Sequence, residues 1–178
     1  SGRTDAGVNA LAQTFHFDAN LTIPAPKIPL AVNQFLPEDI SILSSKQVDD
    51  NFNARFDVKK KTYQYNLYVS NVRLPAKPFS YWLKVQPNLQ EMQKCADVLK
   101  GTHNFKAFMS AGGQSKTFER KIFAIKIKQK GKDITIDVTG SGFLYNMVRI
   151  IVGTLLEVGY GKKTVDDDFL DDLEEAFV

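Results

Sequence analysis

The sequence has 178 residues, of which 43% are hydrophobic and 24% charged. These values are typical of a globular chain with one domain or two small ones, and they exclude a disordered or fibrous protein. The longest apolar stretch, residues 143–158, is interrupted by Asn146, Arg149 and Glu157. We therefore interpret it as a buried helix, and we expect no membrane span.

The chain contains one cysteine, Cys95, and two histidines, His16 and His103. A single cysteine cannot form an internal disulfide, and the sequence holds no recognisable set of zinc or iron ligands. We expect a cytoplasmic protein that binds no metal.

Charge is distributed unevenly along the chain, whose formal net charge is +3. Seven acids and no basic residue follow Val165, which leaves a formal charge of about +10 on the residues before them. A basic body of this kind attracts polyanions such as nucleic acid. A solvated surface with excess lysine is the alternative interpretation of the same composition.

In the first part of the chain, alternation of apolar and polar side chains predicts strands at residues 12–18, 40–43 and 61–69, the last of them central or nearly so. His16 is expected to be a strand residue with its hydrogen bonds satisfied. A short helix is predicted between the first two strands, ending before Leu36-Pro37, because the residue before proline disfavours helical geometry.

The second part of the chain begins with a predicted helix over residues 88–100, where Asn88 and Glu91 have the spacing of a capping box. Two alternating runs then predict a hairpin over residues 123–138, with its lysines on the solvent-exposed face. An apolar helix follows over residues 143–158, and Thr164 is expected to cap a final acidic helix.

Together these elements predict an α+β fold, in which a mostly antiparallel sheet is covered by helices on one face. The order of strands and helices before and after about Ser70 is compatible with two similar halves. We therefore expect a partial N-terminal subdomain at residues 1–70 and a C-terminal subdomain, truncated, at residues 71–178.

Asp5 lies in a glycine-rich loop directly before the first predicted strand. Gly2 and Gly7 on either side of it suggest a backbone held where a larger residue would clash. An aspartate in such a turn usually bonds its own backbone, so spacing alone does not make it catalytic. The loop is a candidate site with a structural alternative.

Arg149 falls in the middle of the apolar stretch, where a buried guanidinium would need a carboxylate or several carbonyl partners. Asp5 is a reasonable partner, and Asp137 and Glu157 are alternatives. An ion pair between Arg149 and Asp5 would orient the carboxylate inside a cleft.

Tyr63 follows three consecutive lysines, Lys59 to Lys61. An aromatic ring beside a basic run is the combination that stacks a base while holding phosphates. The alternative is a core tyrosine at the entry of a strand whose lysines are solvated.

Four segments resemble, in the same order, signature blocks of the TruA-type tRNA pseudouridine synthases. They are Ser1-Gly2-Arg3-Thr4-Asp5-Ala6-Gly7-Val8; Phe52-Asn53-Ala54-Arg55-Phe56 with Lys61-Thr62-Tyr63-Gln64-Tyr65; Gly101-Thr102-His103-Asn104-Phe105; and Phe143 to Gly153 with Glu157-Val158-Gly159. The resemblance extends from Ser1 to about Gly159.

This resemblance implies the pseudouridine synthase fold, with two similar halves, and isomerisation of uridine in the anticodon stem-loop of tRNA without cofactor or metal. Family members act as homodimers, so we expect the intact protein to dimerise. The family also has a strand-containing segment before the signature loop and a closing strand after the acidic helix. We therefore expect a fold incomplete at both ends, for which a non-catalytic tRNA-binding fragment is the alternative function.

The resemblance also assigns roles to four residues. Asp5 matches the essential carboxylate, which either attacks the ribose at C1′ or acts as a base towards it. Arg149 would be its ion-pair partner, and Tyr63 matches the tyrosine that packs on the target base. Arg3 would help to hold the flipped-out nucleotide.

Overall fold

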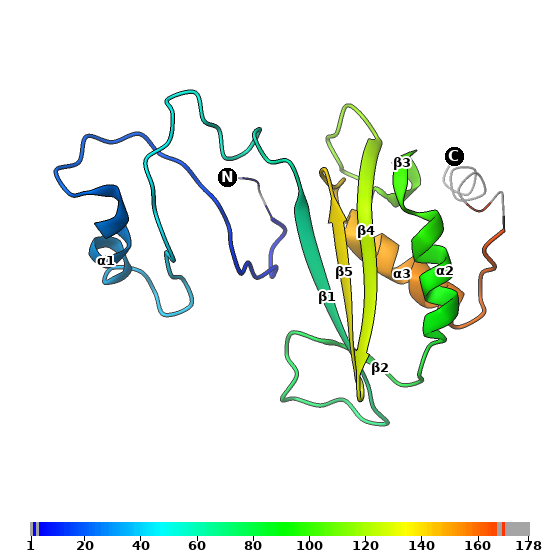
Figure 1. Cartoon of the computed structure of the whole chain (residues 1–178). Coiled ribbons are helices and arrows are strands. Elements are labelled where there is room, and N and C mark those ends of the chain that lie inside the picture. The colour runs from blue at the N-terminus through cyan, green and yellow to red at the C-terminus, as the bar shows by residue number, and fades with distance from the viewer. Residues whose placement is uncertain (1, 3, 167–168, 170–178) are drawn as a thin grey trace. The chain divides into compact units, whose positions relative to one another are not determined.

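The computed structural model describes residues 2, 4–166 and 169 (Figure 1). Contacts within the chain separate it into two compact units, Ser1–Val58 and Lys59–Val178. The strand predicted at residues 61–69 therefore groups with the second unit, whereas the predicted boundary at residue 70 placed it in the first. The assignment of the chain to two related subdomains stays a prediction.

The first unit contains a short helical segment, made of the 3-10 turn η1 (Ala25–Lys27) and helix α1 (Ile28–Asn33). It confirms the helix predicted before Leu36-Pro37. At its end, the Asn33 side-chain amide donates to the Ile42 carbonyl at 3.1 Å and accepts from the Ile42 N–H at 2.8 Å. One side chain thus satisfies both backbone groups of Ile42.

The strands predicted at residues 12–18 and 40–43 are absent from the described structure, which assigns neither segment to a sheet. Phe15 and Phe17 do lie on one side of the chain, with their rings stacked at a centroid distance of 6.1 Å, but they are 52% and 54% exposed. Alternation sets the direction of side chains, whereas a ladder also needs a neighbouring strand. Neither segment pairs with another among the described residues.

The second unit is built on a five-stranded sheet. Its strands are β1 (Lys61–Val69), β2 (Tyr81–Leu83), β3 (Gly101–Asn104), β4 (Glu119–Lys130) and β5 (Asp133–Gly140), in the order β2-β1-β5-β4-β3. The short β2 runs parallel to β1, and the other neighbours are antiparallel. The predicted strand at 61–69 and the predicted hairpin are both confirmed, and β1 is near-central as expected.

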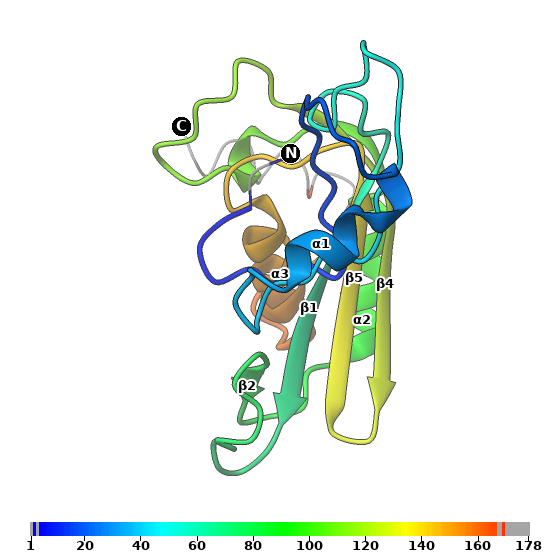
Figure 2. The same cartoon turned by 90° about the vertical axis from the view of Figure 1, so that its left-hand side faces the viewer.

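Helices α2 (Leu89–Val98) and α3 (Met147–Gly159) cover one face of this sheet, and the 3-10 turn η2 (Lys106–Phe108) follows β3 (Figures 1 and 2). The side chain of Asn88 accepts from the N–H groups of Gln90 and Glu91 at 3.0 and 3.3 Å, which confirms Asn88 as the cap of α2. The Asn88 N–H donates to the Gly159 carbonyl at 2.8 Å and Glu91 pairs with Lys94, so the reciprocal half of the predicted capping box does not form. The α+β fold with helices on one face is therefore confirmed, and the two similar halves remain a prediction.

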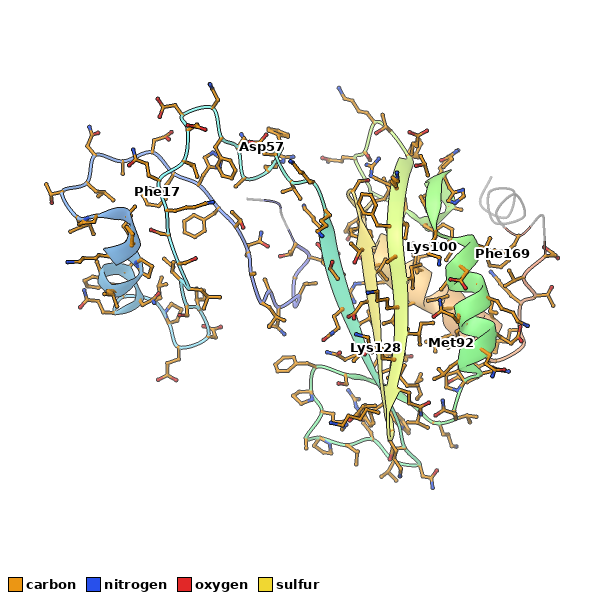
Figure 3. All side chains as sticks on the ribbon, in the orientation of Figure 1. Phe17, Asp57, Met92, Lys100, Lys128 and Phe169 are labelled. Atoms are coloured by element: carbon orange, nitrogen blue, oxygen red, sulfur yellow. The ribbon has the colours of Figure 1, made fainter. Side chains whose placement is uncertain are left out.

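The hydrophobic core lies between the sheet and the two helices. On the sheet side it contains Ile134, Ile136 and Val138, all fully buried. On the helical side it includes Met92 of α2, and Phe169, which Figure 3 labels on the same side. Each such side chain stabilises the fold by about 1.5–3 kcal/mol relative to an exposed one.

A β-bulge in β4 changes the predicted face of Phe123. Ile122 pairs with Gly140 and Ala124 with Thr139, so Phe123 is an additional residue without a register partner. Alternation placed Phe123 beside Ile125 on the buried face, but it is 44% exposed and Ile122 is buried. The extra residue lets both isoleucines reach the core, which alternation alone cannot predict.

The final helix predicted after Thr164 lies largely outside the described residues. In the part of the chain that the structure describes, no helix combines the length and the apolar character that a bilayer crossing requires.

Candidate functional site

Asp5 opens a four-residue turn in the first unit. The Val8 N–H donates to the Asp5 carbonyl at 3.3 Å, and Gly7, at the third position, has φ +76°. A positive φ at this position is what a type II turn requires, and glycine adopts it without strain. A Cβ on Gly7 would meet no atom within 4 Å, so the glycine is needed for its backbone conformation.

The turn leaves the side chain of Asp5 exposed. The hydrogen bond that closes the turn is made by backbone groups, so it does not use the carboxylate. Arg3, the other site residue predicted in this loop, lies outside the described residues.

The segment around Asn53 forms a compact turn in the same unit. The Asn53 side-chain oxygen accepts from the N–H groups of Arg55 and Phe56 at 2.9 and 3.3 Å. The buried Ala54 donates its N–H to Nδ1 of His16 at 3.1 Å. His16 is thus hydrogen-bonded as predicted, although in a loop, and this block has a structural role in holding two segments of the first unit together.

Tyr63 is half-buried on the helix-covered face of β1, where it pairs in register with Val138. Its ring meets the ring of Phe143 edge to face, with centroids 5.3 Å apart. Gly140 makes room for this pair, because a Cβ there would lie 3.1 Å from Phe143 Cζ and from the Lys121 carbonyl oxygen. Sequence reasoning did not assign Phe143 a role, since the contact depends on the path of the chain after β5.

The basic run and the aromatic pair lie at the same end of the sheet. Lys61 pairs in register with Gly140, so the run Lys59 to Lys61 enters β1 where the loop carrying Phe143 leaves β5. A half-buried tyrosine with lysines at its strand entry combines a surface for stacking with cations for phosphate.

The loop at residues 141–146 is fastened to a second loop at residues 109–118. The Ser110 N–H donates to the Tyr145 carbonyl at 3.1 Å, and the Asn146 side chain donates to Ser110 Oγ at 3.2 Å. Asn146 has φ +57°, a left-handed conformation that asparagine tolerates better than most residues. These contacts fix the direction in which α3 starts.

Arg149 lies in the first turn of α3 and is exposed. The expectation of a buried guanidinium is wrong within this unit, because α3 begins at Met147, four residues later than predicted. The arginine is therefore near the start of the helix, while Ile151, Val152 and Leu155 face the core. An exposed guanidinium can be hydrated, so it does not require an acid inside the second unit.

The two alternative partners of Arg149 are both engaged elsewhere. Asp137 accepts from Gln64 at 2.9 Å and lies 3.7 Å from Lys128. Glu157 forms an ion pair with Lys163 at 3.2 Å. Neither acid pairs with Arg149, and the pair between Arg149 and Asp5 stays a prediction.

Arg120 is a further residue that sequence reasoning did not single out. Its guanidinium donates to Ser115 Oγ at 2.8 Å and to the carbonyls of Thr117 and Glu119 at 3.0 and 2.6 Å. Burial lowers the pKa of Arg120 below its ordinary value. The side chain closes the base of the loop at residues 109–118, and no spacing in the sequence indicates this.

Comparison with known proteins identifies relatives of the chain. The family model described as tRNA pseudouridine synthase matches residues 95–169. Proteins named tRNA pseudouridine synthase A from Syntrophomonas wolfei, Thermoanaerobacter pseudethanolicus and Bacillus subtilis are 44%, 42% and 41% identical to it. The matches cover 91%, 94% and 94% of this chain and 66%, 69% and 68% of those proteins. The chain therefore spans about two thirds of the length of these relatives, and it belongs to the tRNA pseudouridine synthase family.

Proposed function

We propose that the protein isomerises uridine to pseudouridine in tRNA, acting in the cytoplasm on the anticodon arm. The similarity to proteins named tRNA pseudouridine synthase A, over 94% of this chain in several relatives, carries the proposal. The chain spans about two thirds of the length of these relatives, so the activity is proposed for the complete protein.

The reaction exchanges one bond to the ribose for another. The bond between C1′ and N1 of the base breaks, the base turns, and a bond between C1′ and C5 forms; the hydrogen on C5 leaves and N1 gains a proton. Asp5 either attacks C1′ or removes a proton from the sugar. Either route requires an accessible carboxylate, and the exposed turn at Gly7 provides one.

An enzyme that acts at C1′ must extrude the target nucleotide, which costs on the order of a few kcal/mol in lost stacking. Tyr63 would offset part of this cost by packing on the base, and the lysines at the entry of β1 would bind phosphates. Arg149, exposed at the start of α3, would pair with Asp5, and Arg3 would hold the extruded nucleotide.

Release of tritium from tRNA labelled at C5 of uridine tests this proposal, because C5 loses its hydrogen in the reaction. The complete protein and its Asp5→Asn variant are compared. We expect the variant to bind tRNA with similar affinity and to release tritium at least about a thousandfold more slowly. Equal rates would remove Asp5 from the mechanism.

A non-catalytic tRNA-binding protein is the alternative function. It would bind tRNA without releasing tritium in either form, so the same experiment separates the two. Sedimentation of the complete protein tests the proposed homodimer, which a strictly monomeric species would contradict.

A further inference from the structure

We propose that Phe123 is a stacking surface for an unpaired RNA base on the face of the sheet that α2 and α3 leave uncovered. The proposal rests on and deepens the proposed function, since the RNA would be the tRNA substrate. It gives that RNA a contact in addition to Asp5, Tyr63, Arg149 and Arg3.

The bulge in β4 determines which way Phe123 points. Ile122 is buried in the core, so its neighbours Lys121 and Phe123 lie on the opposite side of the strand. The ammonium of Lys121 lies 5.7 Å from the centroid of the Phe123 ring, which places both side chains together on that face. The ring is 44% exposed.

The surroundings of Phe123 are polar. Its bulge lies opposite Thr139, whose hydroxyl forms a 2.9 Å hydrogen bond with Thr62 of β1. A protein partner would extend the apolar area around an anchoring aromatic ring, whereas here the neighbours are hydroxyls and an ammonium. A base can stack on one aromatic face and still expose its polar edges to such neighbours.

Cations continue along β4 from this point. Lys126, Lys128 and Lys130 are alternate residues of β4 beyond the bulge, so they lie on one face of the strand about 7 Å apart. The carboxylates of β5 on this face already have partners. Asp137 contacts Gln64 and Lys128, and Asp133 forms an ion pair with Lys77. An aromatic ring at one end of a row of lysines fits a single strand with one base stacked and its phosphates along the row.

The experiment measures the tRNA affinity of the complete protein and of four variants, Lys121→Gln among them, at several salt concentrations. Phe123→Leu keeps an apolar side chain but removes the aromatic face, and Phe123→Trp keeps and enlarges that face. Phe35→Leu is a matched control at another exposed phenylalanine, outside the sheet. We expect Phe123→Leu to weaken binding roughly 5- to 150-fold, as base stacking predicts, and the other two to bind like the unchanged protein.

Salt dependence separates stacking from charge. Phe123→Leu removes no cation, so its slope of log affinity against log salt should be unchanged, whereas Lys121→Gln should reduce that slope by about 0.7–0.9. Affinity of Phe123→Leu equal to that of Phe35→Leu overturns the proposal. A changed oligomeric state with unchanged tRNA affinity also overturns it, because a second copy would then be the occupant.

Failure of this inference is distinguishable from failure of the proposed function. If the unchanged protein releases tritium from labelled tRNA but Phe123→Leu binds normally, only the stacking site is wrong. If Phe123→Leu weakens binding and no tritium is released by any form, the stacking site stands and the catalytic proposal falls.

Discussion

The ring of Tyr63 on β1 meets the ring of Phe143 in the loop after β5 edge to face, with an interplanar angle of 85°. Contacts of this kind contribute about 0.5–1.5 kcal/mol beyond the area they bury. Because Tyr63 is the residue expected to pack on the target base, Phe143 would set the plane in which that ring is held.

Replacing Phe143 by leucine should therefore lower turnover, because the Tyr63 ring loses its edge-to-face partner. We expect kcat/KM for tritium release to fall roughly 2- to 12-fold, which corresponds to loss of the edge-to-face contact. The free energy of unfolding should fall by less than about 1.5 kcal/mol, since the substitution keeps an apolar side chain. A variant with unchanged kcat/KM would show that the pair has no role in the reaction.

Gly7 should be required for activity because of its backbone conformation. A Gly7→Ala substitution forces a residue with a Cβ to a φ of +76°, at a local cost of about 1–2 kcal/mol. We expect the turn to shift, displacing Asp5 and lowering the rate of tritium release at least about tenfold.

Gly131 offers a matched control for this substitution. It has φ +60° in the hairpin between β4 and β5, and a Cβ there also meets no atom within 4 Å. Gly131→Ala should lower the stability of the second unit and leave kcat nearly unchanged. Equal losses of activity in the two variants would contradict a specific role for the Asp5 turn.

The second unit could be predicted largely from the sequence, because its elements carry strong local signals. Alternation predicted β1 and the hairpin, and the position of Asn88 predicted the start of α2. The bulge at Phe123 could not be predicted, since it depends on which isoleucines the core accepts.

The candidate site was predictable only in part. The Asp5 loop and Tyr63 are visible as residue patterns, but the partner of Tyr63 depends on how the chain turns after Gly140. Arg149 was expected to be buried because the surrounding sequence is apolar. The four residues before Met147 form a loop instead of helix, which moves Arg149 to the exposed first turn.

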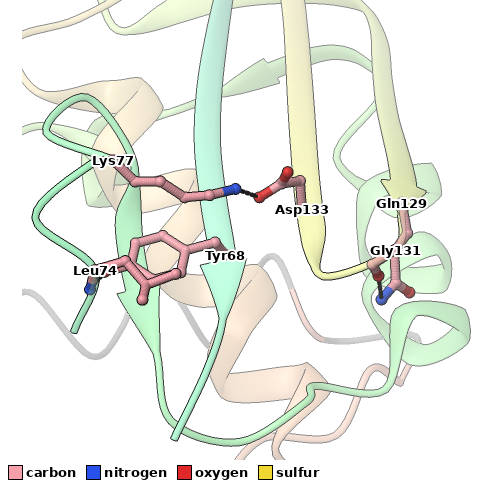
Figure 4. Close-up of polar contacts among 6 residues, drawn as sticks. All are labelled: Tyr68, Leu74, Lys77, Gln129, Gly131 and Asp133. Carbon is pink, nitrogen blue, oxygen red and sulfur yellow. Dashed lines mark hydrogen bonds and ion pairs between the residues drawn. The ribbon is translucent and has the colours of Figure 1, made fainter. Parts of the chain in front are cut away.

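The Tyr68 hydroxyl holds the connection between β1 and β2. Tyr68 is 2% exposed, and its hydroxyl accepts from the Leu74 N–H at 2.8 Å, while Lys77 reaches across to Asp133 (Figure 4). Tyr68→Phe leaves that N–H without its acceptor, and we expect the free energy of unfolding to fall by about 1–2 kcal/mol. Lys77→Ala should cost less, about 0–1 kcal/mol, because that ion pair is exposed. Denaturant titrations that rank the two variants in the opposite order would contradict this view.

Arg120 should keep the loop at residues 109–118 in one conformation. Lysine carries the same charge but cannot reproduce the branched set of bonds to Ser115, Thr117 and Glu119. We expect Arg120→Lys to be cleaved in this loop at least about fivefold faster by a protease, with a smaller change in global unfolding. Identical cleavage rates would show that other contacts, such as those of Ser110, suffice to order the loop.

Ionisation of the Cys95 thiol should make the free energy of unfolding fall with rising pH in the alkaline range. The thiol is fully buried on α2, and this burial raises its pKa from 9.0 to about 12, an effect that Lys163 partly opposes. The unfolded chain releases the thiol proton near pH 9, whereas the folded chain keeps it. The stability that comes from the protonated, buried thiol is therefore fully present below pH 9 and is lost as the pH rises towards 12. Between about pH 8 and pH 10 the free energy of unfolding should fall by about 1 kcal/mol more in the unchanged protein than in Cys95→Ala, which has no thiol to titrate. Guanidinium titrations at both pH values measure the difference, and parallel losses in the two proteins would show that the thiol is already ionised in the folded state.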